Sequence, residues 1–206
     1  MISFLIPVSR ESYKNSLDSI LSQNIKYNYE IILCFNEINL YNKIPNYIKM
    51  NPDIKILNLP EELWFYSYKS LYESANNKYI YYLEDDDLLL TDFSFLDNYP
   101  NFDYYFGIYK NHLKHDIINW TEEILKYKNK SFKKLFKLFK TPRDFYFFQL
   151  SQLLIKRDII KNIPISDNKY NDYYLFKNNP GKIKYINKYF FKQGWDGNNY
   201  SQKDKK

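Results

Sequence analysis

The sequence predicts an α/β protein, a single compact domain with a mostly parallel central sheet flanked by helices. Strand patterns and helix patterns alternate over the first third of the chain, as they do in parallel βαβ units. Hydrophobic residues make up 45% of the chain and aromatic residues 20%, which favours a packed globular protein over a disordered one. The length of 206 residues suits one domain with a core of its own.

The elements of the first half follow from apolar periodicity. Strands are expected at Ile2–Val8, Glu30–Phe35 and Ile54–Leu59, and a fourth apolar run covers Tyr79–Leu83. Two sets of apolar residues recur at helical spacing and predict helices before the second and fourth strands: Tyr13, Leu17, Ile20 and Leu21, then Trp64, Tyr68, Leu71, Tyr72 and Ala75. The sheet is therefore expected to present the carboxyl ends of several parallel strands at one edge, where α/β proteins bind ligands.

The acidic tetrad Glu84–Asp87 directly follows the fourth apolar run. Adjacent carboxylates repel one another, so their presentation at a strand end favours a bound divalent cation. Oxygen ligands alone favour Mg²⁺ or Mn²⁺ over zinc. If the chain stays extended, Glu84 and Asp86 face one way while Asp85 and Asp87 face the other. The alternative is a solvated acidic turn that caps the next segment.

In the second half of the sequence, strand and helix patterns no longer alternate regularly. Strands are expected at Asp103–Tyr109 and Phe147–Lys156, separated by the lysine-rich stretch 121–140. We therefore expect a nucleotide-binding half over residues 1–91 and an irregular half over 92–200 that holds a second substrate, with a frayed tail at 201–206.

Charge and cysteine content exclude several classes. The net charge of +6 permits anionic partners, but lysine-rich composition alone explains it, and nucleic-acid binding is not expected. Cys34 is the single cysteine, so no internal disulfide forms, and its expected place is a buried position late in a strand. No signal peptide or membrane span is expected, which favours a cytoplasmic protein.

A basic amphipathic pattern occupies residues 131–140. Its aromatic and leucine residues share one helical face and its lysines cover the rest. Packing of the apolar face on the core is the favoured interpretation, and contact with anionic lipid at the inner membrane face is the alternative. His112 and His115 are expected to be solvated, because no third ligand has diagnostic spacing.

Glycine is scarce, which limits how a diphosphate can be held. None of the four glycines opens a helix after an early strand, so glycine-rich dinucleotide loops and phosphate-binding lysine loops are absent. A diphosphate would be held chiefly through a metal ion.

Four blocks occur in order along the chain: ISFLIPVSRESYKNSLDSILSQ, YEIILCFNE, SLYESANNKYIYYLEDDDLLL and NDYYLF. Together they resemble successive blocks of family 2 glycosyltransferases of the glycosyltransferase-A fold, from Ile2 to about Ser201. The resemblance implies an inverting, metal-dependent enzyme that moves a sugar from a nucleotide-diphospho-sugar, with a UDP-sugar favoured, to a hydroxyl of a glycan or lipid-linked glycan acceptor. Residues 1–91 would then be the nucleotide-sugar-binding half and residues 92–200 the acceptor half.

The resemblance also implies roles for the tetrad. Such enzymes use an Asp-x-Asp motif after the fourth strand to bind the ribose and the metal. Glu84 and Asp85 match its nucleotide-binding part, Asp86 matches the metal ligand, and Asp87 is the next ligand in line. Glu84 replaces the aspartate that opens the motif in relatives.

The same resemblance implies that Pro7, Val8 and Ser9 line the nucleotide pocket and that Asn36 contacts the base. A solvated Arg10 is the favoured interpretation, with approach to the phosphates as the alternative. Trp195 would stack on the sugar or base from the loop after the last strand.

Asp172 matches the catalytic base of the family. An acceptor hydroxyl is a poor nucleophile until it loses its proton, so single displacement needs a carboxylate within hydrogen-bond reach. The alternative for Asp172 is a carboxylate stabilised by the amides of a helix start. A nucleotidyltransferase, a metal-dependent nuclease and a non-catalytic nucleotide-sugar or glycan-binding relative remain rival functions.

Overall fold

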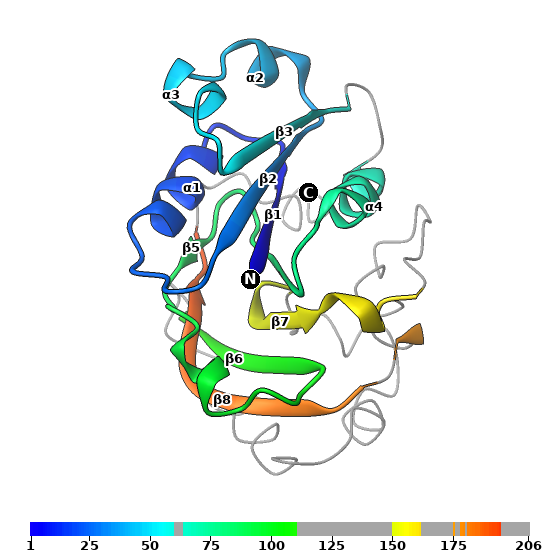
Figure 1. Cartoon of the computed structure of the whole chain (residues 1–206). Coiled ribbons are helices and arrows are strands. Elements are labelled where there is room, and N and C mark those ends of the chain that lie inside the picture. The colour runs from blue at the N-terminus through cyan, green and yellow to red at the C-terminus, as the bar shows by residue number, and fades with distance from the viewer. Residues whose placement is uncertain (60–63, 111–149, 162–174, 176–177, 180, 195–206) are drawn as a thin grey trace, which may run out of the picture.

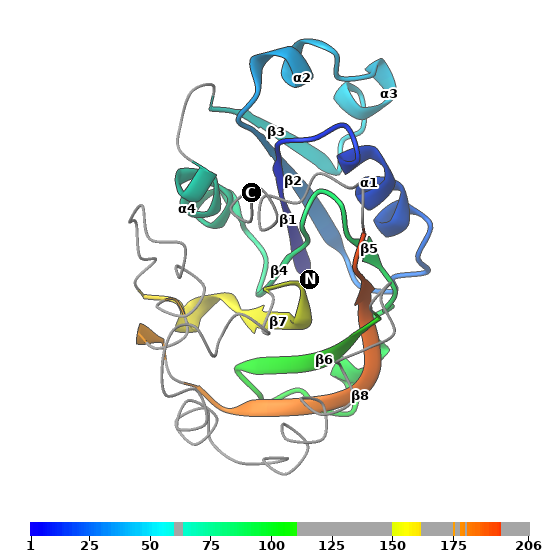
Figure 2. The same cartoon turned by 180° about the vertical axis from the view of Figure 1, so that it is seen from behind.

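The computed structural model describes residues 1–59, 64–110, 150–161, 175, 178–179 and 181–194, and Figures 1 and 2 show it from opposite sides. Within these ranges eight strands form one sheet in the order β3-β2-β1-β4-β7-β6-β8-β5. The strands are β1 Ile2–Val8, β2 Tyr29–Phe35, β3 Ile54–Asn58, β4 Tyr79–Tyr82, β5 Leu88–Leu89, β6 Tyr104–Lys110, β7 Leu153–Lys156 and β8 Ile183–Lys192. The helices are α1 Tyr13–Leu21, α2 Ile38–Asn42, α3 Asn46–Lys49 and α4 Trp64–Ser74, with 3₁₀ turns η1 Ser94–Asp97, η3 Leu150–Gln152 and η4 Arg157–Ile159.

The first half of the sheet is parallel, as the alternating patterns predict. β1 pairs in parallel with both β2 and β4, and β2 pairs in parallel with β3. The predicted strand Ile2–Val8 matches β1 at both ends, and the next two predicted strands differ from β2 and β3 by one residue. The carboxyl ends of β1, β2 and β4 therefore lie at one edge of the sheet.

The second half is mixed and curled, while four of the seven strand pairings among the described residues are parallel, as a mostly parallel sheet requires. β7 pairs antiparallel with β4 and β6, β8 runs parallel to β6, and β5 pairs antiparallel with β8. β5 comes shortly after β4 in the chain but lies at the far end of the strand order, next to α1 (Figure 1). The sheet thus curls until its last strands return to the acidic tetrad. The predicted strand Phe147–Lys156 is shorter than expected, because Leu150–Gln152 forms a 3₁₀ turn.

The core lies on both faces of the parallel strands. On β1, Phe4 and Ile6 belong to the same buried cluster as Leu17 of α1, whereas Leu5 belongs to a second cluster with Leu71 of α4. Successive strand residues point to opposite faces, so a strand that is buried on both sides needs a continuous apolar run. This requirement explains why the β1 sequence is apolar almost throughout.

Among the described residues, no helix is long and apolar enough to cross a membrane. The basic pattern at 131–140, both histidines, Asp172 and Trp195 lie outside the described residues.

Cys34 provides a test of the fold. It is fully buried late in β2, as expected, and burial raises the pKa of its thiol to about 11 despite a hydrogen bond with Ser67. At pH 8 only about one thiol in a thousand would be ionised, and the thiolate is the reactive form. We expect no alkylation of Cys34 by iodoacetamide at pH 8 in folded protein and stoichiometric alkylation in urea, measured by mass spectrometry. Rapid labelling of the folded protein would contradict the placement.

Candidate functional site

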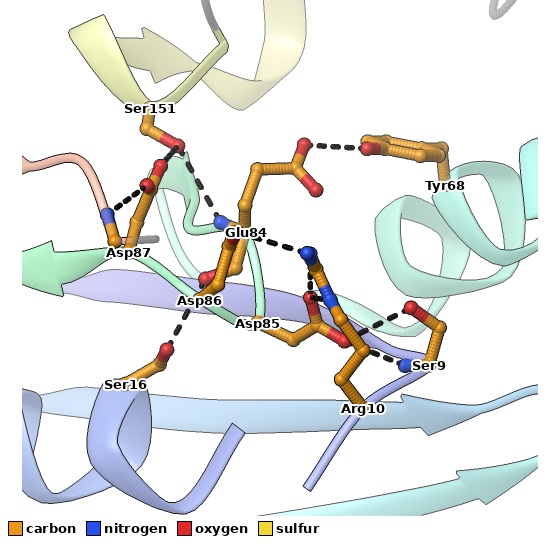
Figure 3. Close-up of polar contacts among 10 residues, drawn as sticks. Ser9, Arg10, Ser16, Tyr68, Glu84, Asp85, Asp86, Asp87 and Ser151 are labelled. Atoms are coloured by element: carbon orange, nitrogen blue, oxygen red, sulfur yellow. Dashed lines mark hydrogen bonds and ion pairs between the residues drawn. The ribbon is translucent and has the colours of Figure 1, made fainter. Parts of the chain in front are cut away.

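The acidic tetrad occupies the joint carboxyl end of β1 and β4. Leu83 continues the parallel pairing beyond β4, since its amide donates to the carbonyl of Leu5 at 3.0 Å. The chain then turns, with the amide of Asp87 donating to the carbonyl of Glu84 at 3.1 Å. The tetrad is therefore a β-turn and not an extended segment, and its side chains reach different parts of the fold (Figure 3).

Asp85 is buried and fully engaged by the end of β1. Its side chain is 1% exposed. One carboxylate oxygen accepts hydrogen bonds from the amide of Ser9 at 2.7 Å and the Ser9 hydroxyl at 3.0 Å. The other accepts from Nε of Arg10 at 2.8 Å and from Nη2 of the same guanidinium. Asp85 thus joins the segment after β1 to the segment after β4.

Arg10 also holds Asp86. Its Nη1 donates to Oδ2 of Asp86 at 2.9 Å, and the two side chains are 20% and 10% exposed. The favoured interpretation of Arg10 as a solvated arginine is therefore wrong. The reason is electrostatic, because adjacent carboxylates attract the guanidinium that β1 brings next to them.

Asp87 points to the other side of the turn, toward the second half of the chain. It is 2% exposed, and it accepts hydrogen bonds from the hydroxyl of Ser151 at 3.0 Å and the amide of Gly194 at 3.2 Å. Burial raises its pKa well above the usual range, and the nearby charges of Asp86 and Glu84 add to the rise. Ser151 also accepts from the amide of Glu84 at 3.4 Å, so one hydroxyl braces both ends of the turn.

Glu84 is half-buried and faces α4. The hydroxyl of Tyr68 donates to its carboxylate at 2.6 Å, and the hydroxyl of Ser16 donates to its main-chain carbonyl at 3.3 Å. Helices α1 and α4 thus both contact the turn.

Asn36 follows β2 at the same edge of the sheet. The main-chain amide of Asn36 donates to the carbonyl of Val8 at 3.2 Å, and its side-chain oxygen accepts from the Ser67 hydroxyl at 2.6 Å. The side chain is half-buried, as is that of Pro7. The residues expected to line a nucleotide pocket therefore come from the adjacent ends of β1 and β2.

The structure brings together most of the site residues expected from the sequence, which are Pro7, Val8, Ser9, Asn36, Glu84, Asp85, Asp86 and Asp87. It also adds contacts that the sequence did not reveal. Tyr68 was expected in the core because it shares a helical face with apolar residues. Ser151 offered a weak signal, as a hydroxyl within an apolar run.

The turn suits a hard divalent cation only if a bound molecule supplies further oxygen ligands. Among the described residues, no group of three or more His, Cys, Asp or Glu side chains is arranged to hold a metal ion. Asp85 and Asp87 are buried and hydrogen-bonded to protein donors. Asp86 keeps partial exposure, and one carboxylate completed by phosphate oxygens is a pattern that Mg²⁺ accepts. The donor chemistry therefore fits a cation that arrives with a diphosphate.

Gly194 makes a testable contribution to this turn. An added Cβ would lie 1.4 Å from the main-chain oxygen of Asp86, so the backbone would have to move and the bond to Asp87 would break. We expect Gly194→Ala to lower the free energy of unfolding by about 1–3 kcal/mol in urea titrations. Gln193→Ala is the control, since the main-chain amide of residue 193 donates a hydrogen bond to the carbonyl of Lys110 and the substitution keeps that amide. Equal stability of both variants would contradict the close approach.

Comparison with known proteins shows the fold. Neither a protein-family model nor a curated protein matches the sequence. The solved structure of S. aureus TarS 1–349 matches with a TM-score of 0.68 at 12% identity, over 94% of this chain and 60% of that one. The complexes of TarS 1–349 with UDP and with UDP-GlcNAc match with TM-scores of 0.66 and 0.69 at 14% and 12% identity, over 93% and 97% of this chain and 59% and 60% of theirs. The chain thus spans about 60% of the TarS 1–349 length. It has the glycosyltransferase-A fold that the order of its sequence blocks predicts.

Proposed function

We propose that this protein is an inverting glycosyltransferase that uses a nucleotide-diphospho-sugar, with a UDP-sugar favoured. The observation that carries the proposal is the acidic turn at the joint carboxyl end of β1 and β4, in a fold shared with TarS. TarS has been solved with UDP and with UDP-GlcNAc, which supports a nucleotide-sugar as the donor.

The donor would lie across the ends of β1, β2 and β4. Asn36 would contact the base, Pro7 and Val8 would line its pocket through the main chain, and Glu84 would approach the ribose. Asp85 would act through Ser9 and Arg10, because its carboxylate is engaged by them.

Asp86 would bind Mn²⁺ or Mg²⁺ together with the diphosphate, and Asp87 would support that contact from the buried side of the turn. The cation would neutralise the charge of the departing diphosphate. At the turn, the side chains of Glu84 and Asp86 are partly exposed. Those of Asp85 and Asp87 are buried, and their hydrogen bonds fix the shape of the turn.

Asp172 would remove the proton of the acceptor hydroxyl, and Trp195 would stack on the donor. The acceptor would be a glycan or a lipid-linked glycan, which suits a cytoplasmic enzyme with peripheral contact at the inner membrane face. These roles rest on the resemblance of the sequence blocks.

Donor binding is tested at Asp86. We expect UDP to bind in the presence of Mn²⁺ and to bind at least about tenfold more weakly to Asp86→Asn, because the neutral amide is a poorer ligand for a hard cation. Isothermal titration calorimetry measures both. Asp53→Asn is the matched control, since Asp53 is exposed and precedes β3 at the opposite edge of the sheet. Equal affinity in all three proteins would contradict the proposed cation site.

Catalysis is tested at Asp172. We expect Asp172→Asn to slow hydrolysis of UDP-sugars by about 10²-fold or more and to leave UDP affinity unchanged, since general-base catalysis contributes about 10²–10⁴-fold. A wild-type protein that binds UDP-sugars but never hydrolyses or transfers them would instead be the non-catalytic relative. The measurement is the rate at which free sugar is released from UDP-sugar, determined by chromatography.

A further inference from the structure

The guanidinium of Arg10 is divided between two carboxylates (Figure 3). Nε and Nη2 both contact one oxygen of Asp85, with the Nε distance at 2.8 Å, while Nη1 contacts Oδ2 of Asp86 at 2.9 Å. Because Ser9 occupies the other oxygen of Asp85, the carboxylate that anchors Arg10 is itself fixed. One end of the guanidinium is therefore anchored by a rigid partner.

The two contacts of Arg10 differ in their surroundings. Asp85 is 1% exposed, whereas Asp86 is 10% exposed and Arg10 20%. A buried charge pair is expensive to break by removing one partner, and a pair that solvent partly reaches exchanges partners more readily. The contact with Asp86 is thus the one that a competing cation can replace.

We propose that Arg10 is a positioning residue that holds Asp86 in the absence of donor and yields it to the divalent cation, so that Arg10 sets the cation affinity of the site. The proposal rests on the proposed function, because it takes Asp86 as the ligand. Nη1 donates to Oδ2 of Asp86, and a divalent cation that binds this oxygen competes with the positively charged guanidinium for it.

Displacement of Nη1 leaves the rest of the clamp in place. Nε and Nη2 keep the guanidinium against Asp85, so Nη1 stays beside the acidic turn. A fixed guanidinium there can donate to a phosphate oxygen of the donor. Arg10 would then neutralise Asp86 before the donor binds and part of the diphosphate afterwards.

Arg10→Lys separates this role from simple support of the fold. Lysine keeps the positive charge beside buried Asp85 but lacks the fork that spans both carboxylates. We expect Arg10→Lys to bind Mn²⁺ about three- to tenfold more tightly than wild type, as the lost competition predicts. The measurement is the dissociation constant of Mn²⁺ at saturating UDP, obtained from titrations monitored by calorimetry and by electron paramagnetic resonance.

Arg157→Lys is the matched control, because Arg157 lies beyond β7 and its amide donates to the carbonyl of Lys78, which precedes β4. We expect its Mn²⁺ affinity to stay within about twofold of wild type. A double variant with Asp86→Asn should lose the gain of Arg10→Lys, since the competition acts through Asp86.

The outcomes separate the two proposals. Mn²⁺ affinity that is equal or weaker in folded Arg10→Lys, or a gain that persists with Asp86→Asn, overturns the role of Arg10 and leaves the transferase standing. Absence of Mn²⁺ binding in every protein overturns both. If Arg10→Lys does not fold, crystals of the wild-type protein soaked with MnCl₂ and UDP decide. The Nη1 contact to Asp86 must then be broken and the Asp85 contacts kept, and an intact Nη1 contact overturns the proposal.

Discussion

The buried carboxylate of Asp85 is the interaction on which the site depends. It sits where two parallel strands end together, and it accepts four hydrogen bonds from Ser9 and Arg10, which are more than 70 residues away in the chain. A buried charge that loses its partner is strongly destabilising, typically by about 3–5 kcal/mol. The fold therefore fixes the ends of β1 and β4 relative to each other, and with them the directions of the remaining carboxylates.

The tetrad also shows how a fold tolerates adjacent like charges. The four carboxylates are directed to partners in three parts of the fold. Glu84 contacts α4, Asp85 and Asp86 share Arg10 after β1, and Asp87 contacts η3 and the segment after β8. This separation reduces repulsion without removing it, as the raised pKa of Asp87 indicates. In the proposed function, the negative charge that remains at the turn would attract the cation.

The sequence predicts the parallel half of the fold well, because strands buried on both faces need continuous apolar runs such as Ile2–Val8. It also locates the tetrad, since four acidic residues after such a run are conspicuous. The sequence did not predict the antiparallel pairings of β7 with β4 and β6 or of β5 with β8. Those pairings join distant segments, and their register depends on the whole sheet. The solvated interpretation of Arg10 failed for the same reason. Only the register of β1 against β4 brings the guanidinium to Asp85.

The curl of the sheet has a consequence for how the protein is made. β5 emerges from the ribosome soon after β4, but its partner β8 and the amide of Gly194 follow about a hundred residues later. Pairings between distant segments form slowly, since the loop between them must close first. The segments on the two sides of residue 91 therefore do not fold independently of each other. The acidic turn of a nascent chain therefore stays incomplete until Gly194 has been synthesised.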